Sequence, residues 1–192
     1  RVGEKETGPN TGGMGAYSPA PIIDKNIEKK IINKIVKPTL RALINKNNPY
    51  TGFLYVGLMI KNNEPYLIEY NVRMGDPECQ VIMPRLKNDL VKLINATVEN
   101  KLNKIKIIWN KEKCMGAVIC ARGYPGKYIK NKIINLKNIK LTRKKIIYHA
   151  GTKLKNNLIF SNGGRVLNVV VLGSTFLSIR NEIFKIIKKI NW

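Results

Sequence analysis

The stretch that decides the fold is YLIEYNVRMGDPE, residues 66–78. Its apolar side chains predict a buried β-strand, yet Glu69, Asn71 and Arg73 occupy every second position in it. Side chains of a strand alternate between its two faces, so these three polar groups are expected on one face. The Gly-Asp-Pro that follows predicts a tight turn and the end of the strand. This pattern indicates that something charged lies against that face.

Glu69 and Asn71 have the chemistry of a magnesium site. Positions two apart on a strand lie about 6 to 7 Å apart, and their hard oxygens can share a Mg²⁺ ion that keeps its waters and binds nucleotide phosphates. Arg73 would add a fork of donors for a phosphate or a developing acyl phosphate. The alternative is an edge strand whose polar face is only solvated. The strand alone leaves both interpretations open.

The composition is that of a globular protein with one ordinary domain or two small ones. The chain has 192 residues, of which 44% are hydrophobic. No apolar run approaches the roughly 20 residues needed to span a bilayer, and no signal-peptide pattern opens the sequence. The three cysteines, Cys79, Cys114 and Cys120, form no CxxC pair. They are expected to be reduced thiols of a cytoplasmic protein.

The net charge of +23, from 35 Lys and Arg against 12 Asp and Glu, is the strongest compositional feature. A charge of this size suggests a basic nucleic-acid-binding module. The lysines, however, are mixed with isoleucine and asparagine, as in IEKKIINKIVK, and these three residue types share AT-rich codons. Few aromatic residues lie between the basic ones as stacking platforms. Codon drift is therefore the favoured explanation, with the nucleic-acid module kept as the alternative function.

The first half of the chain shows two helical patterns and one hairpin pattern. Asp24 is a plausible helix cap, and Pro38 is expected to kink or split the helix that follows it. Two strands joined by the Asn-rich turn KNNE predict an antiparallel hairpin. The expected ranges are a helix at about 24–45, strands at 52–60 and 65–71, and a helix at about 84–102.

The second half changes to short strands, in CMGAVICA, KIIYHAG and LIFSNGGRVLNVVVLG. The Asn162-Gly163-Gly164 triplet predicts a hairpin between two of them. A last helix is expected over about 175–190, capped by Ser174 or Thr175. The predicted fold class is α/β (α+β), with an α/β segment at 1–102 and a β-rich segment at 103–192 that a helix closes.

Together, GPNTGGMGAYSPAP, YTGFLYVGLMI, IEYNVRMGDPECQ, HAGT and NGGRVLNVVVLG resemble the phosphoribosylamine–glycine ligases, or glycinamide ribonucleotide synthetases, of the ATP-grasp superfamily. The resemblance covers nearly the whole chain in order. It implies the C-terminal part of an ATP-grasp domain at 1–102 and a small, barrel-sandwich-like C-terminal domain at 103–192. Another ATP-grasp carboxylate–amine ligase is the rival, but GGMGAYSP and RMGDPE favour the member that uses glycine.

The resemblance implies a ligase of purine biosynthesis with ATP as co-substrate. ATP phosphorylates the glycine carboxylate, and the amine of 5-phosphoribosylamine attacks the glycyl phosphate to give glycinamide ribonucleotide, ADP and phosphate. By motif, Glu69 and Asn71 match the ligands of Mg²⁺ or Mn²⁺. Arg73 matches a catalytic residue at the transferring phosphate, where fixed positive charge is needed.

The same resemblance implies substrate-facing and phosphate-facing residues around two glycine-containing segments. Glycines allow backbone to approach a ligand closely and offer N–H groups to anions. The alternative for the first segment, NTGGMGAYSP, is a plain surface loop. Gly57 stands where many ATP-grasp relatives carry an acidic metal ligand, which leaves fewer ligands to name. The expected substrate or phosphate contacts are Gly12, Gly13, Met14, Gly75 and Asp76.

The family's N-terminal domain and its two-stranded ATP lid have no counterpart in the sequence. The chain is therefore expected to be a fragment, either an incomplete record of a longer ligase or the product of a split or decaying gene. The lack of an initiator methionine favours the first. The missing N-terminal half is the expected partner, without which little ligase activity is expected. No specific nucleic acid and no membrane is expected as a partner.

Overall fold

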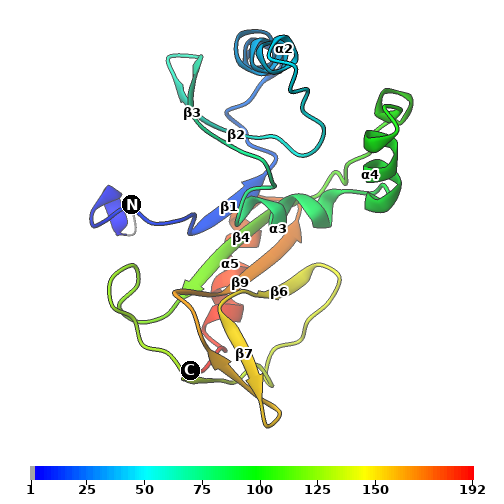
Figure 1. Ribbon diagram of the computed structural model, residues 1–192. Coiled ribbons are helices and arrows are strands. Elements are labelled where there is room, and N and C mark those ends of the chain that lie inside the picture. The colour runs from blue at the N-terminus through cyan, green and yellow to red at the C-terminus, as the bar shows by residue number, and fades with distance from the viewer. Residues whose placement is uncertain (1–2) are drawn as a thin grey trace. The chain divides into compact units, whose positions relative to one another are not determined.

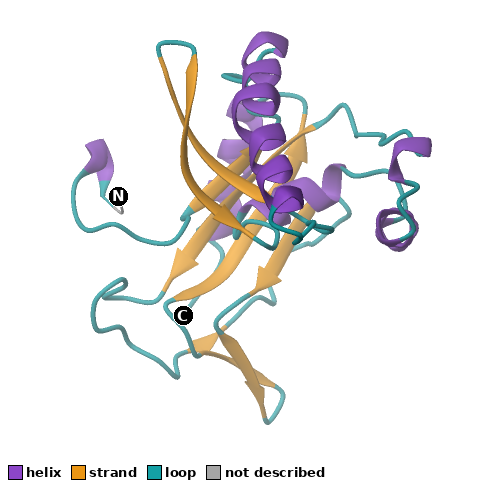
Figure 2. Cartoon of the chain, turned by 45° about the horizontal axis from the view of Figure 1, so that its top comes forward, coloured by secondary structure: helices purple, strands orange, loops and turns teal. Residues whose placement is uncertain are grey.

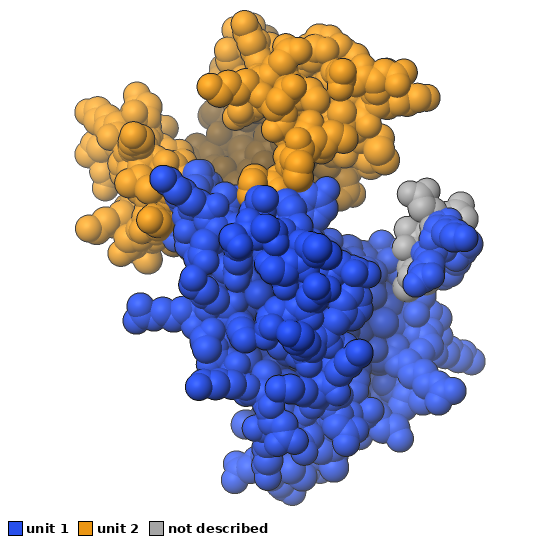
Figure 3. All heavy atoms as spheres, turned by 180° about the vertical axis from the view of Figure 1, so that it is seen from behind, with its two compact units in different colours: residues 1–18, 76–86, 109–192 blue, residues 19–75, 87–108 orange. Residues whose placement is uncertain are grey.

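The structure is a computed structural model that describes residues 3–192. Arg1 and Val2, which belong to the loop expected to open the chain, lie outside the described residues. The chain forms two compact units whose segments alternate along the sequence (Figure 3). We call residues 1–18, 76–86 and 109–192 the sheet unit, and residues 19–75 and 87–108 the hairpin unit. The division at residue 102 stays a prediction.

The sheet unit is built on a four-stranded antiparallel sheet with the order β1-β4-β9-β6 (Figure 1). Strand β9 is central, and all of its residues except the first and the last are buried. Helix α5 (Phe176–Ile187) covers one face of the sheet, and the short helix α3 (Glu78–Ile82) packs on the other. The strands are β1 (Gly15–Ser18), β4 (Lys113–Cys120), β6 (Lys145–His149) and β9 (Arg165–Gly173).

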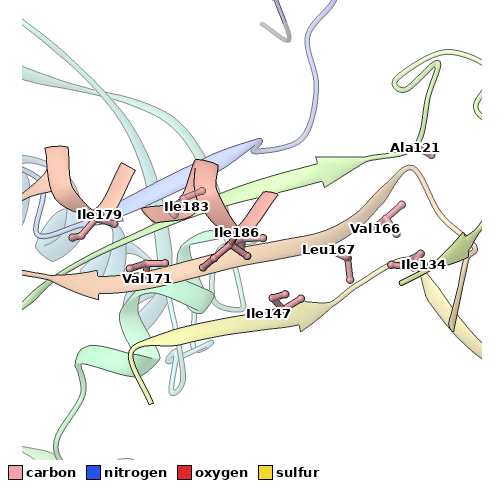
Figure 4. Packing of buried hydrophobic residues seen from close by; sticks show 10 residues of the cluster. Ala121, Ile134, Ile147, Val166, Leu167, Val171, Ile179, Ile183 and Ile186 are labelled. Carbon is pink, nitrogen blue, oxygen red and sulfur yellow. The ribbon is translucent and has the colours of Figure 1, made fainter. Parts of the chain in front are cut away.

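The core follows from the alternation of apolar side chains on β9. Leu167, Val169 and Val171 point to one face, where α5 places three isoleucines at helical spacing (Figure 4). Val170 and Leu172 point to the other face and pack with Val81 of α3. The buried isoleucines of α5 are Ile179, Ile183 and Ile186. The predicted helix and its Thr175 cap are confirmed, since Thr175 Oγ1 accepts from the Ser178 N–H at 3.2 Å.

A second, three-stranded sheet corrects one sequence prediction. Strands β8 and β9 lie in different sheets, so the hairpin predicted at Asn162-Gly163-Gly164 is wrong. A Cβ on Gly163 would lie 2.8 Å from the Cα of Gly151, so these glycines let two backbone segments touch. The hairpin turn instead lies at Asn156 and Asn157, whose φ angles are 49° and 58°. The strands, in order across the sheet, are β5 (Ile133–Ile134), β8 (Leu158–Ser161) and β7 (Thr152–Lys155).

The hairpin unit contains the predicted hairpin, formed by β2 (Tyr55–Lys61) and β3 (Glu64–Asn71) and shown as a long twisted ribbon in Figure 2. Its turn residues, Asn62 and Asn63, have φ angles of 52° and 58°, as tight hairpin turns require. The expectation that this stretch is buried is wrong, because Tyr66 and Ile68 are 56% and 63% exposed.

The long helical stretch of the hairpin unit begins where the sequence predicts. Asp24 Oδ1 accepts from the Ile27 N–H at 2.8 Å and caps the first turn. The break expected at Pro38 takes the form of a π-helical turn just before it, where the Lys37 N–H bonds to the Ile32 carbonyl. The segments are α1 (Lys25–Ile31), η2 (Ile32–Val36) and α2 (Lys37–Asn45).

The helix expected at about 84–102 is shorter than predicted. The chain forms a single 3₁₀ turn and leaves it at Leu86, whose ψ of 124° is extended. Asp89 then caps α4 (Leu90–Val98) by accepting from the Val91 N–H at 2.8 Å. That 3₁₀ turn is η3 (Met83–Arg85), and the other short 3₁₀ turns are η1 (Glu4–Glu6) and η4 (Leu102–Lys104). Within residues 3–192 no helix is long and apolar enough to cross a membrane.

Candidate functional site

Glu69 and Asn71 lie at the end of β3, on the face that the sequence predicts for both. Glu69 pairs with Gly57 of β2, and Asn71 pairs with Tyr55 at the first residue of that strand. The Asn71 amide Nδ2 donates to Glu69 Oε1 at 3.0 Å, so the two side chains are in direct contact. A half-turn of the amide would present its oxygen in place of its nitrogen. Two oxygen ligands for one cation can therefore come from these residues.

Gly57 explains how the Glu69 side chain finds room on the hairpin. A Cβ on Gly57 would lie 2.9 Å from Glu69 Cγ, which is closer than real side chains approach. The glycine is buried beneath the glutamate although Glu69 itself is exposed. A carboxylate on β2 at this position would need the very space that Glu69 fills. Gly57 therefore lies directly opposite Glu69 in the ladder, and binding of a metal by Glu69 stays a prediction.

A β-bulge corrects the simple alternation expected over residues 66–73. The register shifts between Gly57 and Leu58, so Leu58 pairs with Leu67 and Ile68 has no partner of its own. The strand also ends at Asn71, because its partner strand begins at Tyr55. The prediction that polar side chains share one face of the strand is therefore correct for Glu69 and Asn71.

Arg73 lies beyond the strand, which corrects its predicted place on the strand face. It follows the last pair of the ladder and is exposed. Its Nη1 donates to the carbonyl of the next residue, Met74, at 2.8 Å. This contact uses one of the five guanidinium N–H groups. A role at a phosphate stays a prediction.

The donor set at Glu69 and Asn71 fits a hard divalent cation that keeps part of its water shell. Within residues 3–192 no group of three or more His, Cys, Asp and Glu side chains could hold a metal. A zinc site of thiolates and imidazoles is therefore not formed by the described residues. One carboxylate and one amide oxygen suit Mg²⁺, which is commonly bound by one or two protein carboxylates together with substrate phosphates.

The other predicted contacts lie in the sheet unit, where Arg165 joins them. Arg165 Nη1 donates to the carbonyls of Gly13 and Asp76, both at 3.0 Å. Arg165 Nη2 donates to Asp76 Oδ2 at 2.7 Å. One guanidinium thus binds both Gly13 and Asp76, which are 63 positions apart in the sequence. Sequence reasoning missed Arg165, although it is the charged residue that opens the apolar strand in the NGGRVLNVVVLG motif.

The glycines of the loop are explained first by packing within the chain. A Cβ on Gly12 would lie 3.2 Å from Arg165 Cζ. On Gly13 it would collide with Pro77 Cδ and lie 3.2 Å from the Asp76 carbonyl. Met14 continues the ladder of β1, since its carbonyl accepts from the Val118 N–H at 2.9 Å. Direct contact of Gly12, Gly13 and Met14 with a ligand stays a prediction.

Asp76 is held from two sides while its carboxylate stays about half exposed. Gln80 Nε2 donates to Oδ1 at 2.9 Å, and Arg165 donates to Oδ2. The side chain of Asp76 is 48% exposed, whereas Gly75 before it is buried. Asp76 thus presents a fixed, negatively charged group at the surface of the sheet unit.

The cysteines show no sign of a nucleophile. None of the three forms a disulfide within the described residues, as the sequence predicts. Burial raises the pKa of Cys114 to about 12, despite the opposing charge of Arg85. The pKa of Cys79 is also raised, first by burial and then by the negative charge of Asp76. Thiols with raised pKa values are poor nucleophiles near neutral pH.

Comparison with known proteins matches both parts of the chain to one family. Residues 1–79 match the model described as phosphoribosylglycinamide synthetase, ATP-grasp (A) domain. Residues 114–192 match phosphoribosylglycinamide synthetase, C domain. Phosphoribosylamine–glycine ligase of Vibrio vulnificus is 44% identical over the whole chain, and that of Pseudomonas aeruginosa is 40% identical. The chain spans 45% of the length of both relatives.

Solved structures support the same family relationship. The crystal structure of phosphoribosylamine–glycine ligase from Thermotoga maritima is 33% identical and has a TM-score of 0.84, over 97% of this chain and 46% of that one. An L-amino acid ligase from Bacillus licheniformis has a TM-score of 0.62 at 14% identity, over 96% of this chain and 44% of that one, which shows the shared fold alone. These findings confirm the α/β fold class and its ATP-grasp relationship. The chain belongs to the phosphoribosylglycinamide synthetase family.

Proposed function

We propose that this chain supplies the metal-binding strand and the C domain of a phosphoribosylamine–glycine ligase. The single observation that carries the proposal is the contact between Glu69 and Asn71, at 3.0 Å, at the end of β3. Membership of the family supports the reaction. In the proposed division, residues 1–102 belong to the ATP-grasp domain and residues 103–192 to the C-terminal domain.

The proposed reaction joins glycine to 5-phosphoribosylamine in de novo purine biosynthesis. A carboxylate oxygen of glycine attacks the γ-phosphorus of ATP, and ADP leaves. The amine of phosphoribosylamine then attacks the carbonyl carbon of the glycyl phosphate. Phosphate leaves, the nitrogen loses a proton, and glycinamide ribonucleotide remains. Neither step needs a nucleophilic side chain, which agrees with the raised pKa values of Cys79 and Cys114.

Each predicted site residue has a defined task in this proposal. Glu69 and Asn71 hold Mg²⁺ or Mn²⁺, which when bound neutralises charge on the phosphates of ATP. Arg73 is the catalytic residue that binds the transferring phosphate through its guanidinium. The backbone around the two glycine-containing segments meets the substrates. These contacts are Gly12, Gly13, Met14, Gly75 and Asp76.

The proposed partner is the polypeptide that makes up the remaining length of the relatives, which corresponds to their N-terminal half. The chain spans 45% of the length of the relatives it matches, and this supports a shared active site. We also propose a cytoplasmic location, in keeping with three cysteines that form no disulfide within the described residues. Without its partner the chain is expected to have little ligase activity.

The test is ligase activity after this chain is joined to or co-expressed with the N-terminal half. ATP, Mg²⁺, glycine and phosphoribosylamine are supplied, and Glu69→Ala is compared with Glu99→Ala. Glu99 is a matched control, because it is an exposed carboxylate in the same unit that pairs only with Lys101 in the described structure. Turnover that Glu69→Ala abolishes and Glu99→Ala preserves supports the proposal. A folded Glu69→Ala enzyme with parental activity would refute the site.

A further inference from the structure

Positive charge is almost uncompensated over the larger part of the sheet unit. From Lys113 to Asn181 the sequence contains fourteen lysines and arginines but no aspartate or glutamate. The three-stranded sheet of β5, β8 and β7 lies within this stretch. Codon drift explains how many lysines the chain has, but their placement decides what the surface attracts. A region without carboxylates attracts polyanions from solution.

One face of the three-stranded sheet combines two of these lysines with an aromatic ring. Lys153 of β7 pairs with Phe160 of β8, and Lys155 pairs with Leu158. Ile133 of β5 pairs with Phe160 from the other side. Side chains at directly paired positions, and at positions two apart on one strand, project from the same face of a sheet. We call Lys153, Lys155, Leu158 and Phe160 the lysine–phenylalanine face.

Phe160 lies on the side of the sheet that faces away from the core. Its neighbour Ile159 points to the opposite face and is one of the described residues that pack against the buried core cluster, whereas Phe160 is not. Phe160 is half-buried and lines an open cavity of about 420 Å³. An aromatic ring is therefore accessible beside two lysines. The other residues that line this cavity are Asn131, Lys153, Lys155, Asn156 and Leu158.

The two lysines of this face have their full hydrogen-bonding capacity available. Both are exposed, and within residues 3–192 neither ammonium group has a hydrogen-bond acceptor or an ion-pair partner. By contrast, Lys145 of the same unit pairs with Glu182 at 2.6 Å. Each ammonium group of the face offers three donors and a full positive charge. The face can therefore bind two anionic groups without breaking an ion pair of the described structure.

The ring and the lysines together decide which polyanion fits. Lysines alone attract any anion, including an acidic peptide, whose side chains would leave Phe160 unused. In a nucleic acid duplex the bases are stacked on one another and hidden from a side chain. A single strand presents its phosphates to ammonium groups and the flat faces of its bases to an aromatic ring. It is the polyanion that uses both parts of this face.

We propose that the lysine–phenylalanine face binds single-stranded nucleic acid without sequence preference. Lys153 and Lys155 contact neighbouring phosphates, and a base stacks on the ring of Phe160. Leu158 and Ile133, which are 45% and 51% exposed, extend the apolar surface beside the ring. This binding is separate from the proposed ligase reaction and needs neither ATP nor a metal.

The test is binding of a fluorescein-labelled oligouridylate to the 192-residue chain, followed by fluorescence anisotropy. The oligonucleotide has about 12 nucleotides, within the site sizes of folds that bind single strands. Phe160→Ala should weaken binding at least about fivefold, because a stacked base is lost. Phe184→Ala is the matched control. It removes another ring of the sheet unit, 47% exposed on α5, and should leave binding unchanged.

Two further variants separate loss of the ring from loss of packing. Phe160→Leu keeps an apolar side chain of similar size but cannot stack, and should weaken binding as much as Phe160→Ala. Phe160→Tyr keeps the ring and should bind like the parent. Circular dichroism checks that each variant is folded. Equal affinities of the Leu and Tyr variants would assign Phe160 a packing role and overturn the stacking contact.

The salt dependence of binding measures the phosphate contacts of the lysines. Replacing Lys153 and Lys155 together with methionine should lower the slope of log affinity against log salt concentration by about 1.4, since each phosphate contact of a single strand contributes about 0.7. Replacing Lys188 and Lys189 removes the same charge from the end of α5 and should change the slope much less. Equal changes of the slope would show that net charge alone attracts the strand.

The proposal is also overturned if the oligonucleotide does not bind at about 100 µM protein in about 50 mM salt, where even non-specific complexes form. The same holds if polyglutamate of equal charge, or a duplex, binds as tightly as the single strand. Equal affinities of Phe160→Ala and Phe184→Ala would have the same meaning. None of these measurements involves Glu69, ATP or Mg²⁺. Either proposal can therefore fail while the other stands.

Discussion

Strands β9 and β3 are both rich in apolar residues, yet one is buried and the other is largely open. All residues of β9 from Val166 to Leu172 are buried, with helices packed on both faces of its sheet. On β3, Tyr70 bonds to Thr39 of α2 at 2.5 Å, while Tyr66, Leu67 and Ile68 are exposed. A strand is thus buried only where other elements pack against the faces of its sheet, and its apolar composition alone is not enough.

The comparison also separates stability from ligand binding. The sheet unit has the larger buried core, and its polar candidates, Asp76 and Arg165, are fixed by hydrogen bonds at its surface. The hairpin unit presents Glu69 and Asn71 on an open strand, where hydration of a bound cation is possible.

The largest effect is expected from truncating matched leucines on the two strands. Leu167 of β9 is fully buried, and Leu167→Ala should lower the free energy of unfolding by about 2 to 5 kcal/mol. Leu67 of β3 is 45% exposed, and Leu67→Ala should cost about 0.5 kcal/mol or less. Urea unfolding followed by circular dichroism measures both. Equal costs at the two positions would contradict the contrast.

Helix caps should have smaller and similar effects in the two units. Asp24 caps α1 of the hairpin unit, and Thr175 caps α5 of the sheet unit. Replacing either with alanine leaves helix N–H groups without their acceptor and should cost about 1 kcal/mol. The same unfolding measurement applies, with Ser and Asn as conservative replacements that should restore stability. A cap effect several times larger in one unit would show that local bonds also differ between the units.

The smallest effect is the pH dependence that Glu64 adds to the stability of the hairpin unit. Hydrogen bonds from Lys30 and then Lys34 lower the pKa of Glu64 to about 2, against an ordinary value of 4.5. The carboxylate therefore contributes stability above about pH 4.5, and this contribution is lost as the pH falls through 2. Glu64→Gln should flatten that part of the pH–stability curve. The chemical shift of the Glu64 carboxyl carbon, followed by NMR against pH, measures this pKa. A midpoint near pH 4.5 would show that Glu64 does not pair with Lys30 and Lys34.

The sequence was sufficient to predict structure where a residue interacts with its near neighbours in the chain. Asp24, Thr175 and the Asn62-Asn63 turn act within a few residues of themselves, and all three predictions are confirmed. The pairing of Glu69 with Asn71 on one face follows from strand periodicity alone.

The sequence failed where a distant partner decides the structure. The glycines at 163 and 164 look like a hairpin turn. Instead, Gly163 lets the backbone approach Gly151 closely, and the chain passes from one sheet to the other between β8 and β9. Helix α3 was missed because the Gly-Asp-Pro before it reads as a turn. Arg165 was missed because its partners, Gly13 and Asp76, are far away in sequence. The exposure of β3 likewise depends on what covers it, which periodicity does not report.

The Mg²⁺ dependence of the assembled ligase with Glu69→Gln tests directly whether the Glu69–Asn71 pair binds the metal. Glutamine keeps the size of the side chain, and with it the fit over Gly57, but removes the negative charge from the Glu69–Asn71 pair. If the pair binds Mg²⁺, the Mg²⁺ concentration for half-maximal activity should rise by at least about tenfold. An unchanged Mg²⁺ dependence in a folded Glu69→Gln enzyme would contradict it.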